Sequence, residues 1–129
     1  MEEWFWQLDL LLDDLDFSDN QLSGMVLNSL RFRLGGTADL SGNHFSGPIP
    51  HNIGEVMPLL GDVDISRNSF TGCIPLSIGN LSRLSTLVIS NNHLSGEVPD
   101  FWNSLSESVY LRYVKQQSIW SNAKIHGDP

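Results

Sequence analysis

Apolar and polar positions along the chain repeat with a period of 23 to 25 residues. Four segments follow one frame, LxxLxLxxNxLSGxIPxxI, and they span residues 12–30, 35–53, 60–78 and 84–102. The same steps separate the asparagines of the frame, Asn20, Asn43, Asn68 and Asn92, and its glycines, Gly24, Gly47, Gly72 and Gly96. A fixed period of about 20 to 30 residues, to which apolar positions are locked, is typical of a solenoid.

Each part of the frame predicts a different piece of backbone. The LxL part alternates with period two, so it predicts a short strand whose apolar residues share one face. Strands stacked at the repeat period form a parallel sheet that is buried on its inner side. The Ser-Gly step predicts a bend with positive φ, and Ile-Pro resumes an extended segment. We expect the last apolar residue of each frame to plug the outer side of the core, namely Leu30, Ile53, Ile78 and Trp102.

The asparagine column is polar, yet it stands between apolar positions that we expect to be buried. A buried amide must be satisfied, and it can donate and accept hydrogen bonds toward the backbone of neighbouring coils. We therefore predict a structural asparagine ladder made of Asn20, Asn43, Asn68 and Asn92. A catalytic asparagine is the alternative, but four copies at a constant spacing favour the structural interpretation.

The frame resembles the plant-type leucine-rich repeat, with its LSGxIP segment, as found in the extracellular domains of plant receptor-like proteins and receptor-like kinases. The resemblance covers residues 12–102. It implies an α/β-type solenoid of about four repeats, a right-handed superhelix with a short parallel concave sheet and a convex side of loops and 3-10 turns. Two departures are visible: Leu27 replaces the proline found in the other repeats, and Gly35, Gly36 and Ala38 weaken the core of the second repeat.

The resemblance also implies a function. Proteins of this family bind peptides, proteins or small hormones on the concave or lateral surface. They act in defence or developmental signalling at the extracellular face of the plasma membrane, where they are glycoproteins. For this chain it implies a peptide or protein ligand and a co-receptor as partners, and no enzyme activity, cofactor or metal.

The two ends of the chain depart from the frame. Residues 1–11 align with the end of a repeat, so we expect a partial preceding repeat there, followed by the array over 12–103. Residues 104–129 lack both LxLxxN and LSGxIP. If the first base of the Ser108 codon is dropped, codons can be chosen that spell LYIYDMSNNSLSGAMPRSMGT, a repeat in register. We interpret this tail as an out-of-frame former repeat; the alternative is an evolved amphipathic cap.

Composition narrows the function classes. The chain has 129 residues, of which 40% are hydrophobic and 17% charged, so it fits one folded domain or part of one. A net charge of −8 argues against nucleic acid as a partner, because phosphates attract clustered Lys and Arg. The single cysteine, Cys73, allows no internal disulfide. The acidic N-terminus and the lack of a long apolar run predict no export signal, membrane anchor or membrane insertion in the chain itself.

The outward strand positions form columns across the repeats that we predict to face a ligand. Because neighbouring strands lie about 4.8 Å apart, aspartates stacked in such a column form an acidic strip suited to a basic peptide or protein loop. A solvated sheet face is the alternative, and a paired-carboxylate hydrolase is a further one that lacks an apolar pocket. The predicted binding positions are Asp14, Asp16, Ser18, Asp19, Thr37, Asp39, Ser41, Asp62, Asp64, Ser66, Arg67, Thr86, Val88, Ser90 and Asn91.

Other candidate residues give weaker evidence for a functional site. His44 and His93 share a turn position where no converging metal ligands are visible, and Cys73 has no histidine placed to activate it. Asn80-Leu81-Ser82 is an N-glycosylation sequon, used only in a secreted protein. The tryptophans are interpreted as core plugs at Trp6 and Trp102 and as a surface residue at Trp4.

Three functional hypotheses follow. The first is a binding module that keeps part of the recognition surface of a plant receptor-like protein. The second is a truncated or frameshifted gene product without an evolved molecular function. The third is an inhibitor of a secreted cell-wall hydrolase, similar to the polygalacturonase-inhibiting proteins, although the secretion signal and disulfide-bearing caps of such inhibitors are not expected here.

Overall fold

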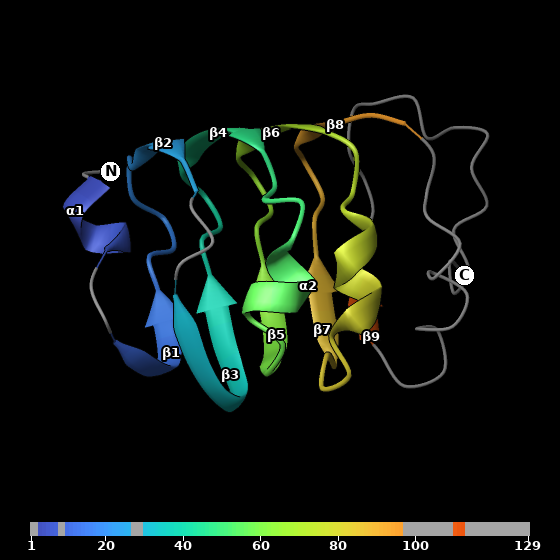
Figure 1. The fold of residues 1–129 in the computed structure, drawn as a ribbon. Coiled ribbons are helices and arrows are strands. Elements are labelled where there is room, and N and C mark those ends of the chain that lie inside the picture. The colour runs from blue at the N-terminus through green and yellow to red at the C-terminus, as the bar shows by residue number, and fades with distance from the viewer. Residues whose placement is uncertain (1–2, 8–9, 27–29, 97–109, 113–129) are drawn as a thin grey trace.

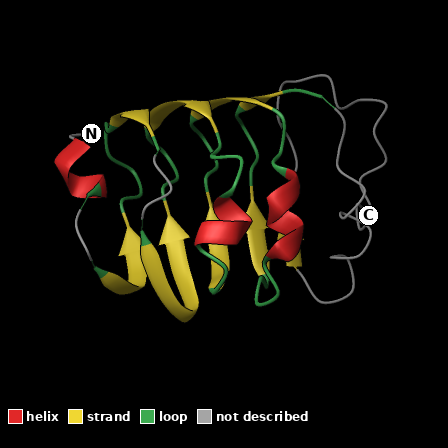
Figure 2. Cartoon of the chain, in the orientation of Figure 1, coloured by secondary structure: helices red, strands yellow, loops and turns green. Residues whose placement is uncertain are grey.

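A computed structural model of the chain describes residues 3–7, 10–26, 30–96 and 110–112. The backbone winds into successive coils, and each of the first four coils contributes one strand to each of two parallel sheets (Figure 1). Short helical segments cover the side of the coils opposite the larger sheet (Figure 2). The solenoid predicted from the repeat period is therefore the architecture of the chain.

The larger sheet contains the first part of each LxL segment. Two helical segments lie between its strands in the sequence, and a third precedes its first strand. Its order is β1 (Leu11–Asp16), β3 (Arg31–Asp39), β5 (Leu60–Asp64), β7 (Thr86–Val88) and β9 (Tyr110–Arg112). The helical segments are α1 (Glu3–Trp6), the α-helix α2 (Ile53–Val56) and the 3-10 helix η1 (Leu76–Asn80).

The second sheet was not anticipated, because the sequence predicted only a bend at the Ser-Gly step. The bend is present, with φ of +99° at Gly24 and +78° at Gly47. The flanking residues are extended and stack at the repeat period, so their backbone groups pair as neighbouring strands. The order of this sheet is β2 (Ser23–Met25), β4 (His44–Pro48), β6 (Ser69–Gly72) and β8 (His93–Leu94).

The core consists of the inward apolar residues of every coil. Phe45 and Phe70, from successive coils, stack with ring centroids 6.4 Å apart and an interplanar angle of 18°. The predicted plugs Leu30, Ile53 and Ile78 are buried, as is Trp6 at the N-terminal end, whereas Trp102 and Leu27 lie outside the described residues and the side chain of Trp4 is not described.

The second repeat fills its core in a way that the sequence frame did not predict. Leu12 pairs with Phe32 and Asp14 with Thr37, so β3 bulges between these two pairings. Phe32 is only 4% exposed and replaces the leucine that the frame lacks here. Its side chain packs over Gly36, where an added Cβ would lie 3.0 Å from the Phe32 Cβ and Cδ1. The expected weakness at the two glycines is thus compensated by a residue upstream.

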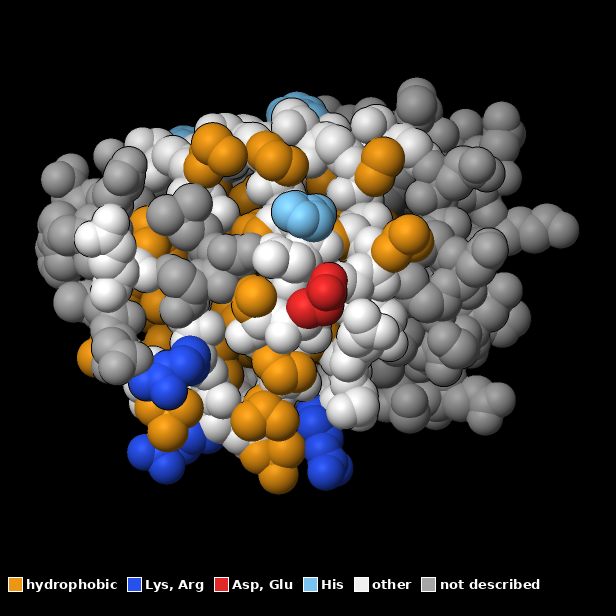
Figure 3. Space-filling model, in the orientation of Figure 1, with side chains coloured by type: hydrophobic (Ala, Val, Ile, Leu, Met, Phe, Trp, Pro, Cys, Tyr) orange, Lys and Arg blue, Asp and Glu red, His pale blue; other side chains and the backbone are white. Residues whose placement is uncertain are grey.

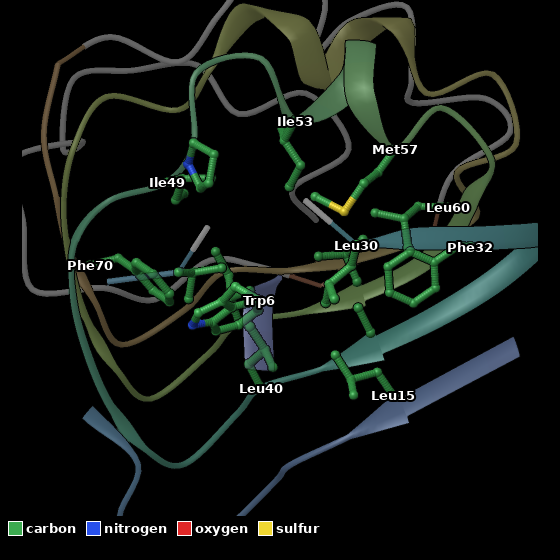
Figure 4. Close-up of a pocket in the computed structure, with 15 residues that line it drawn as sticks. Trp6, Leu15, Leu30, Phe32, Leu40, Ile49, Ile53, Met57, Leu60 and Phe70 are labelled. Atoms are coloured by element: carbon green, nitrogen blue, oxygen red, sulfur yellow. The ribbon is translucent and has the colours of Figure 1, made fainter. Parts of the chain in front are cut away.

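A core cavity remains beside Ala38. It has a volume of about 50 Å³ and an almost wholly apolar lining, to which Trp6, Leu30, Phe32 and Leu60 contribute (Figure 4). Ala38 is at the fourth position of the repeat frame in the second coil, where the other coils have Leu15, Val63 and Leu87. The small side chain leaves part of the space between coils unfilled.

The buried Ser77 connects η1 to α2. The Ser77 hydroxyl accepts a hydrogen bond from the Gly54 amide at 3.0 Å and donates one to the His51 carbonyl at 2.9 Å. A Cβ at Gly54 would overlap with the Ser77 carbonyl oxygen. The close approach of α2 and η1 therefore requires glycine at position 54.

The predicted domain boundaries, 1–11, 12–103 and 104–129, stay predictions. Within the third segment the structure describes only β9, whose backbone pairs Tyr110 with Thr86 and Arg112 with Val88, one repeat step from β7. No helix among the described residues is long and apolar enough to cross a membrane.

Candidate binding surface on the five-stranded sheet

Five aspartates form an acidic strip on the outer face of the five-stranded sheet. The register pairs Asp14 with Thr37 and Thr37 with Asp62, and the next column pairs Asp16, Asp39 and Asp64 in turn. Asp14 and Asp16 are exposed and the other three are half-buried, while the intervening Leu15 and Val63 point into the core. The strip, made of Asp14, Asp16, Asp39, Asp62 and Asp64, crosses three coils and gives way to Thr86 and Val88 in the fourth.

Each carboxylate of the column from Asp16 to Asp64 is held by a serine two residues later. Oδ1 of Asp16 accepts the Ser18 amide at 2.9 Å and its hydroxyl at 2.6 Å. The pairs Asp39–Ser41 and Asp64–Ser66 repeat this geometry, with amide distances of 3.0 and 2.9 Å and hydroxyl distances of 2.6 Å. The repeated Asp-x-Ser sequence therefore orients the column.

The serine column was predicted to face a ligand, and this expectation is wrong for two of its members. Ser41 is 3% exposed and Ser66 is 6% exposed. The strands end at Asp39 and Asp64. Beyond these residues the side chains no longer alternate between the two faces of the sheet, and the serine hydroxyls turn back toward the aspartates. Ser41 and Ser66 position the strip, while Ser18 and Ser90 are half-buried.

The two remaining carboxylates of the strip are also held by hydroxyl groups. Thr37 donates to Oδ1 of Asp14, and Ser85 from the next coil donates to Oδ1 of Asp62 at 3.1 Å. All five strip carboxylates thus use Oδ1 to accept a hydroxyl hydrogen bond. Because these donors are neutral, they orient the carboxylates without cancelling their charge.

The pKa of Asp16 shows the effect of these hydrogen bonds. The Ser18 hydroxyl, and then the Ser18 amide, stabilise the ionised carboxylate and lower the pKa of Asp16 below its ordinary value of 3.8. The carboxylate is therefore ionised at neutral pH and available to a cationic group.

Three arginines of the described part of the chain lie away from the strip. Arg31 and Arg33 belong to the N-terminal half of β3, and Arg83 belongs to the turn before β7. Figure 3, which views the helical side, shows basic side chains next to hydrophobic ones along the lower edge. Arg33 pairs with Asp13 through Nε and Oδ1 at 3.3 Å, outside the strip.

A row of left-handed residues follows the strands and contains a further arginine, Arg67. Asp19, Gly42, Arg67 and Asn91 have φ between +55° and +68°. Nη1 of Arg67 lies 3.1 Å from Oδ1 of Asp19, two coils away, and the ion pair passes over Gly42. Asp19 and Arg67 were predicted to face a ligand, but in the structure they contact each other. Opposite charges flanking a glycine at one repeat position were the signal for this pair.

The asparagine column connects neighbouring coils beneath the acidic strip. The Asn68 Nδ2 donates to the carbonyls of Leu40, Ile65 and Ser66 at 2.8, 3.3 and 3.1 Å, and its Oδ1 accepts the Phe45 amide at 3.0 Å. Asn43 and Asn92 make the equivalent contacts to their preceding coils. Asn20 is exposed and bonds within its own coil, to Phe17 and Ser18.

The remaining candidate residues form no metal site among the described residues. His44, His51, His93 and Cys73 are exposed, and the described residues contain no group of three or more His, Cys, Asp or Glu that could hold a metal ion. A surface hollow of about 470 Å³ between the second sheet and the helices is mainly apolar, with His51 and Cys73 among its lining residues. The acidic strip is therefore the charged surface with a repeated, oriented geometry.

Comparisons with known proteins show a repeat family and similar solved structures. The family model described as Leucine Rich Repeat matches residues 37–56, 60–81 and 83–105, which is half of the chain. A chain in the crystal structure of the BIR3–SERK2 complex from Arabidopsis thaliana has a TM-score of 0.67 and 31% identity, over 79% of this chain and 54% of that one.

A second solved structure agrees. The BIR2 ectodomain from Arabidopsis thaliana has a TM-score of 0.61 and 28% identity, and the match covers 84% of this chain and 59% of that one. The chain thus spans less than two thirds of the length of either solved chain. No curated protein matches it.

Proposed function

The chain belongs to the leucine-rich-repeat family, and on that premise we propose that it is a protein- or peptide-binding module that recognises a basic segment with its five-stranded sheet. The similar solved structures, one of them a complex of BIR3 with SERK2, support a protein partner. We further propose that the module works in receptor signalling of plant defence or development, at the extracellular face, with a co-receptor as a second partner.

The observation that carries the proposal is the oriented acidic strip. Its column of three carboxylates follows strands that lie about 4.8 Å apart, so neighbouring charges repel by about 1 kcal/mol in a water-like dielectric. Each carboxylate accepts a hydrogen bond at its Oδ1 from a neutral hydroxyl group, as at Asp16 and Asp39. A ligand with Lys or Arg side chains relieves this repulsion and gains charge-assisted hydrogen bonds.

A binding experiment with a defined probe tests the proposal. The probe is a fluorescein-labelled octa-arginine peptide, with octa-glutamate as the negative control, and affinity is read by fluorescence anisotropy at two salt concentrations. The triple substitution Asp16→Asn, Asp39→Asn and Asp64→Asn keeps the shape of the side chains and removes their charge. We expect it to weaken binding about tenfold or more, because several oriented charge contacts are lost together.

A matched variant separates the strip from total charge. Asp13→Asn, Asp19→Asn and Glu55→Gln remove the same number of charges from exposed positions outside the strip. We expect this variant to weaken binding about twofold or less. Equal losses in the two triple variants, with unchanged circular dichroism, would mean that octa-arginine senses only net charge and that the strip is not a binding surface.

A further inference from the structure

The core cavity beside Ala38 is lined by side chains from the first three coils. Leu15, Ala38 and Val63 stand at one position of three paired strands, and all three line the cavity. Met57, which directly follows α2, reaches the same space from the helical side, and Trp6 of α1 lines it as well (Figure 4). The cavity therefore lies inside the array, between the five-stranded sheet and α2.

The backbone keeps the walls of this cavity apart. The strands that carry Leu15, Ala38 and Val63 are paired in register, and paired strands lie about 4.8 Å apart. Further along the same coils, Asn43 joins the second coil to the first by donating to the Phe17 carbonyl at 2.9 Å. Neighbouring coils are thus held at a fixed spacing, so the side chains around Ala38 can relax only partly into the space that it leaves.

The lining of the cavity favours an apolar occupant over water. A buried water needs two to four polar partners, whereas the side chains that line this space present almost no polar surface. An engineered protein cavity of about 150 Å³ with a similar lining of Leu, Ile and Phe stays dry and binds benzene or xenon. The rings of Phe32 and Phe70 and the thioether of Met57 offer dispersion contacts to any atom that fills the space.

The volume of the cavity limits the size of its ligand. At about 50 Å³ it has about one third of the volume that admits benzene. We propose that the cavity is a binding site for one small apolar molecule, of the size of xenon or a two-carbon hydrocarbon, which makes the contacts that Ala38 cannot make. A ligand of so few atoms gains little from each of them, so we expect a dissociation constant of about 1–100 mM. This site is separate from the acidic strip and does not depend on its charge.

Xenon is the probe that tests the site, and NMR of the full chain with carbon-13-labelled methyl groups reads its binding as the gas pressure is raised. We expect saturable changes in chemical shift at the methyl groups of Leu15, Leu60 and Met57, which line the cavity. Ile78 and Leu94 are also buried but do not line it, so their methyl groups serve as the internal reference. Changes that grow linearly with pressure and are equal in the two sets of methyl groups overturn the proposal.

Two variants test whether xenon binds beside Ala38. Ala38→Val fills the space with two methyl groups and should weaken xenon binding tenfold or more. Thr71→Val introduces the same residue at an exposed position of β6 and should change the affinity less than twofold. Undiminished binding to a folded Ala38→Val chain overturns the assignment to this cavity. If that variant does not fold, the two sets of methyl groups in the unaltered chain still decide the proposal.

Benzene tests the size of the site. It should leave the methyl groups of Leu15, Leu60 and Met57 unshifted in the unaltered chain, because the cavity is too small for an aromatic ring. Saturable benzene binding at these methyl groups overturns the assigned size of the ligand.

Discussion

Arg67 reaches across a whole coil to pair with Asp19, with 3.1 Å between Nη1 and Oδ1. The residue beneath the ion pair is Gly42, whose φ is +68°. A Cβ at position 42 would lie 3.0 Å from Arg67 Nη1 and would overlap with Asp19 Oδ1. One glycine thus provides both the left-handed turn of its coil and the clearance for a contact between the coils on either side.

We expect Gly42→Ala to lower the free energy of unfolding by about 1–2 kcal/mol, because an alanine is strained at positive φ and its Cβ displaces the ion pair. Urea unfolding followed by circular dichroism measures the change.

Arg67→Gln serves as the comparison for this substitution. It removes the ion pair alone, whose side chains are 53% and 70% exposed, so its cost should stay below about 1 kcal/mol. If Gly42→Ala costs no more than Arg67→Gln, backbone strain at position 42 contributes nothing and the argument for a required glycine fails.

An asparagine of the ladder should contribute more to the free energy of unfolding inside the array, at Asn68, than at the first position of the ladder, Asn20. Asn68→Ala removes the partner of the buried Phe45 amide and three donated hydrogen bonds, so we expect a loss of about 2–4 kcal/mol in unfolding free energy. Asn20→Ala breaks contacts within an exposed coil and should cost less than about 1 kcal/mol. Equal costs in urea titrations would contradict the ladder as a connection between coils.

Filling the core cavity should stabilise the chain. Ala38→Val adds two methyl groups to a space of about 50 Å³ with an apolar lining, and we expect a gain of about 0.5–1.5 kcal/mol. Ala38→Thr has nearly the same shape but places a hydroxyl in that space, so it should lose most of the gain. Thermal unfolding of the three proteins measures the difference, and a threonine as stabilising as valine would show that the space is not apolar.

The hydrogen bonds of Ser18 should control the titration of Asp16. Ser18→Ala removes the hydroxyl that contributes most to lowering the pKa of Asp16, so that pKa should rise toward 3.8, while Ser18→Thr should keep it low. Because the folded pKa lies below the unfolded one, the stabilisation is present above about pH 3.8 and disappears as the pH falls through the folded value. NMR titration of the Asp16 carboxyl carbon reads the shift, and identical curves for alanine and threonine would contradict the assigned cause.

Much of the scaffold could be predicted from the spacing of residues. The period of the asparagines and glycines predicted parallel strands stacked in register, and the pairing of Asp39 with Asp64 follows it. Positive φ at the Ser-Gly step, the buried plugs and the contact of Asn68 with the preceding coil also follow the frame. These features repeat with the chain, so one position in one coil predicts its equivalents.

Features that break the repeat could not be predicted in this way. Phe32 lies outside the frame and fills the space that Gly36 leaves, because the bulge in β3 brings it there. The burial of Ser41 depends on where its strand ends. The contact between Asp19 and Arg67 joins coils that are not neighbours in the repeat order.

By itself, the sequence determined the solenoid, its family and the columns of the outer sheet. These features depend on the period at which apolar and polar residues recur along the chain. The tertiary structure decided which of the column residues remain available to a partner. Exposure at Asp16, burial at Ser66 and pairing at Arg67 are set by where each strand ends and by what the adjoining coils place beside it.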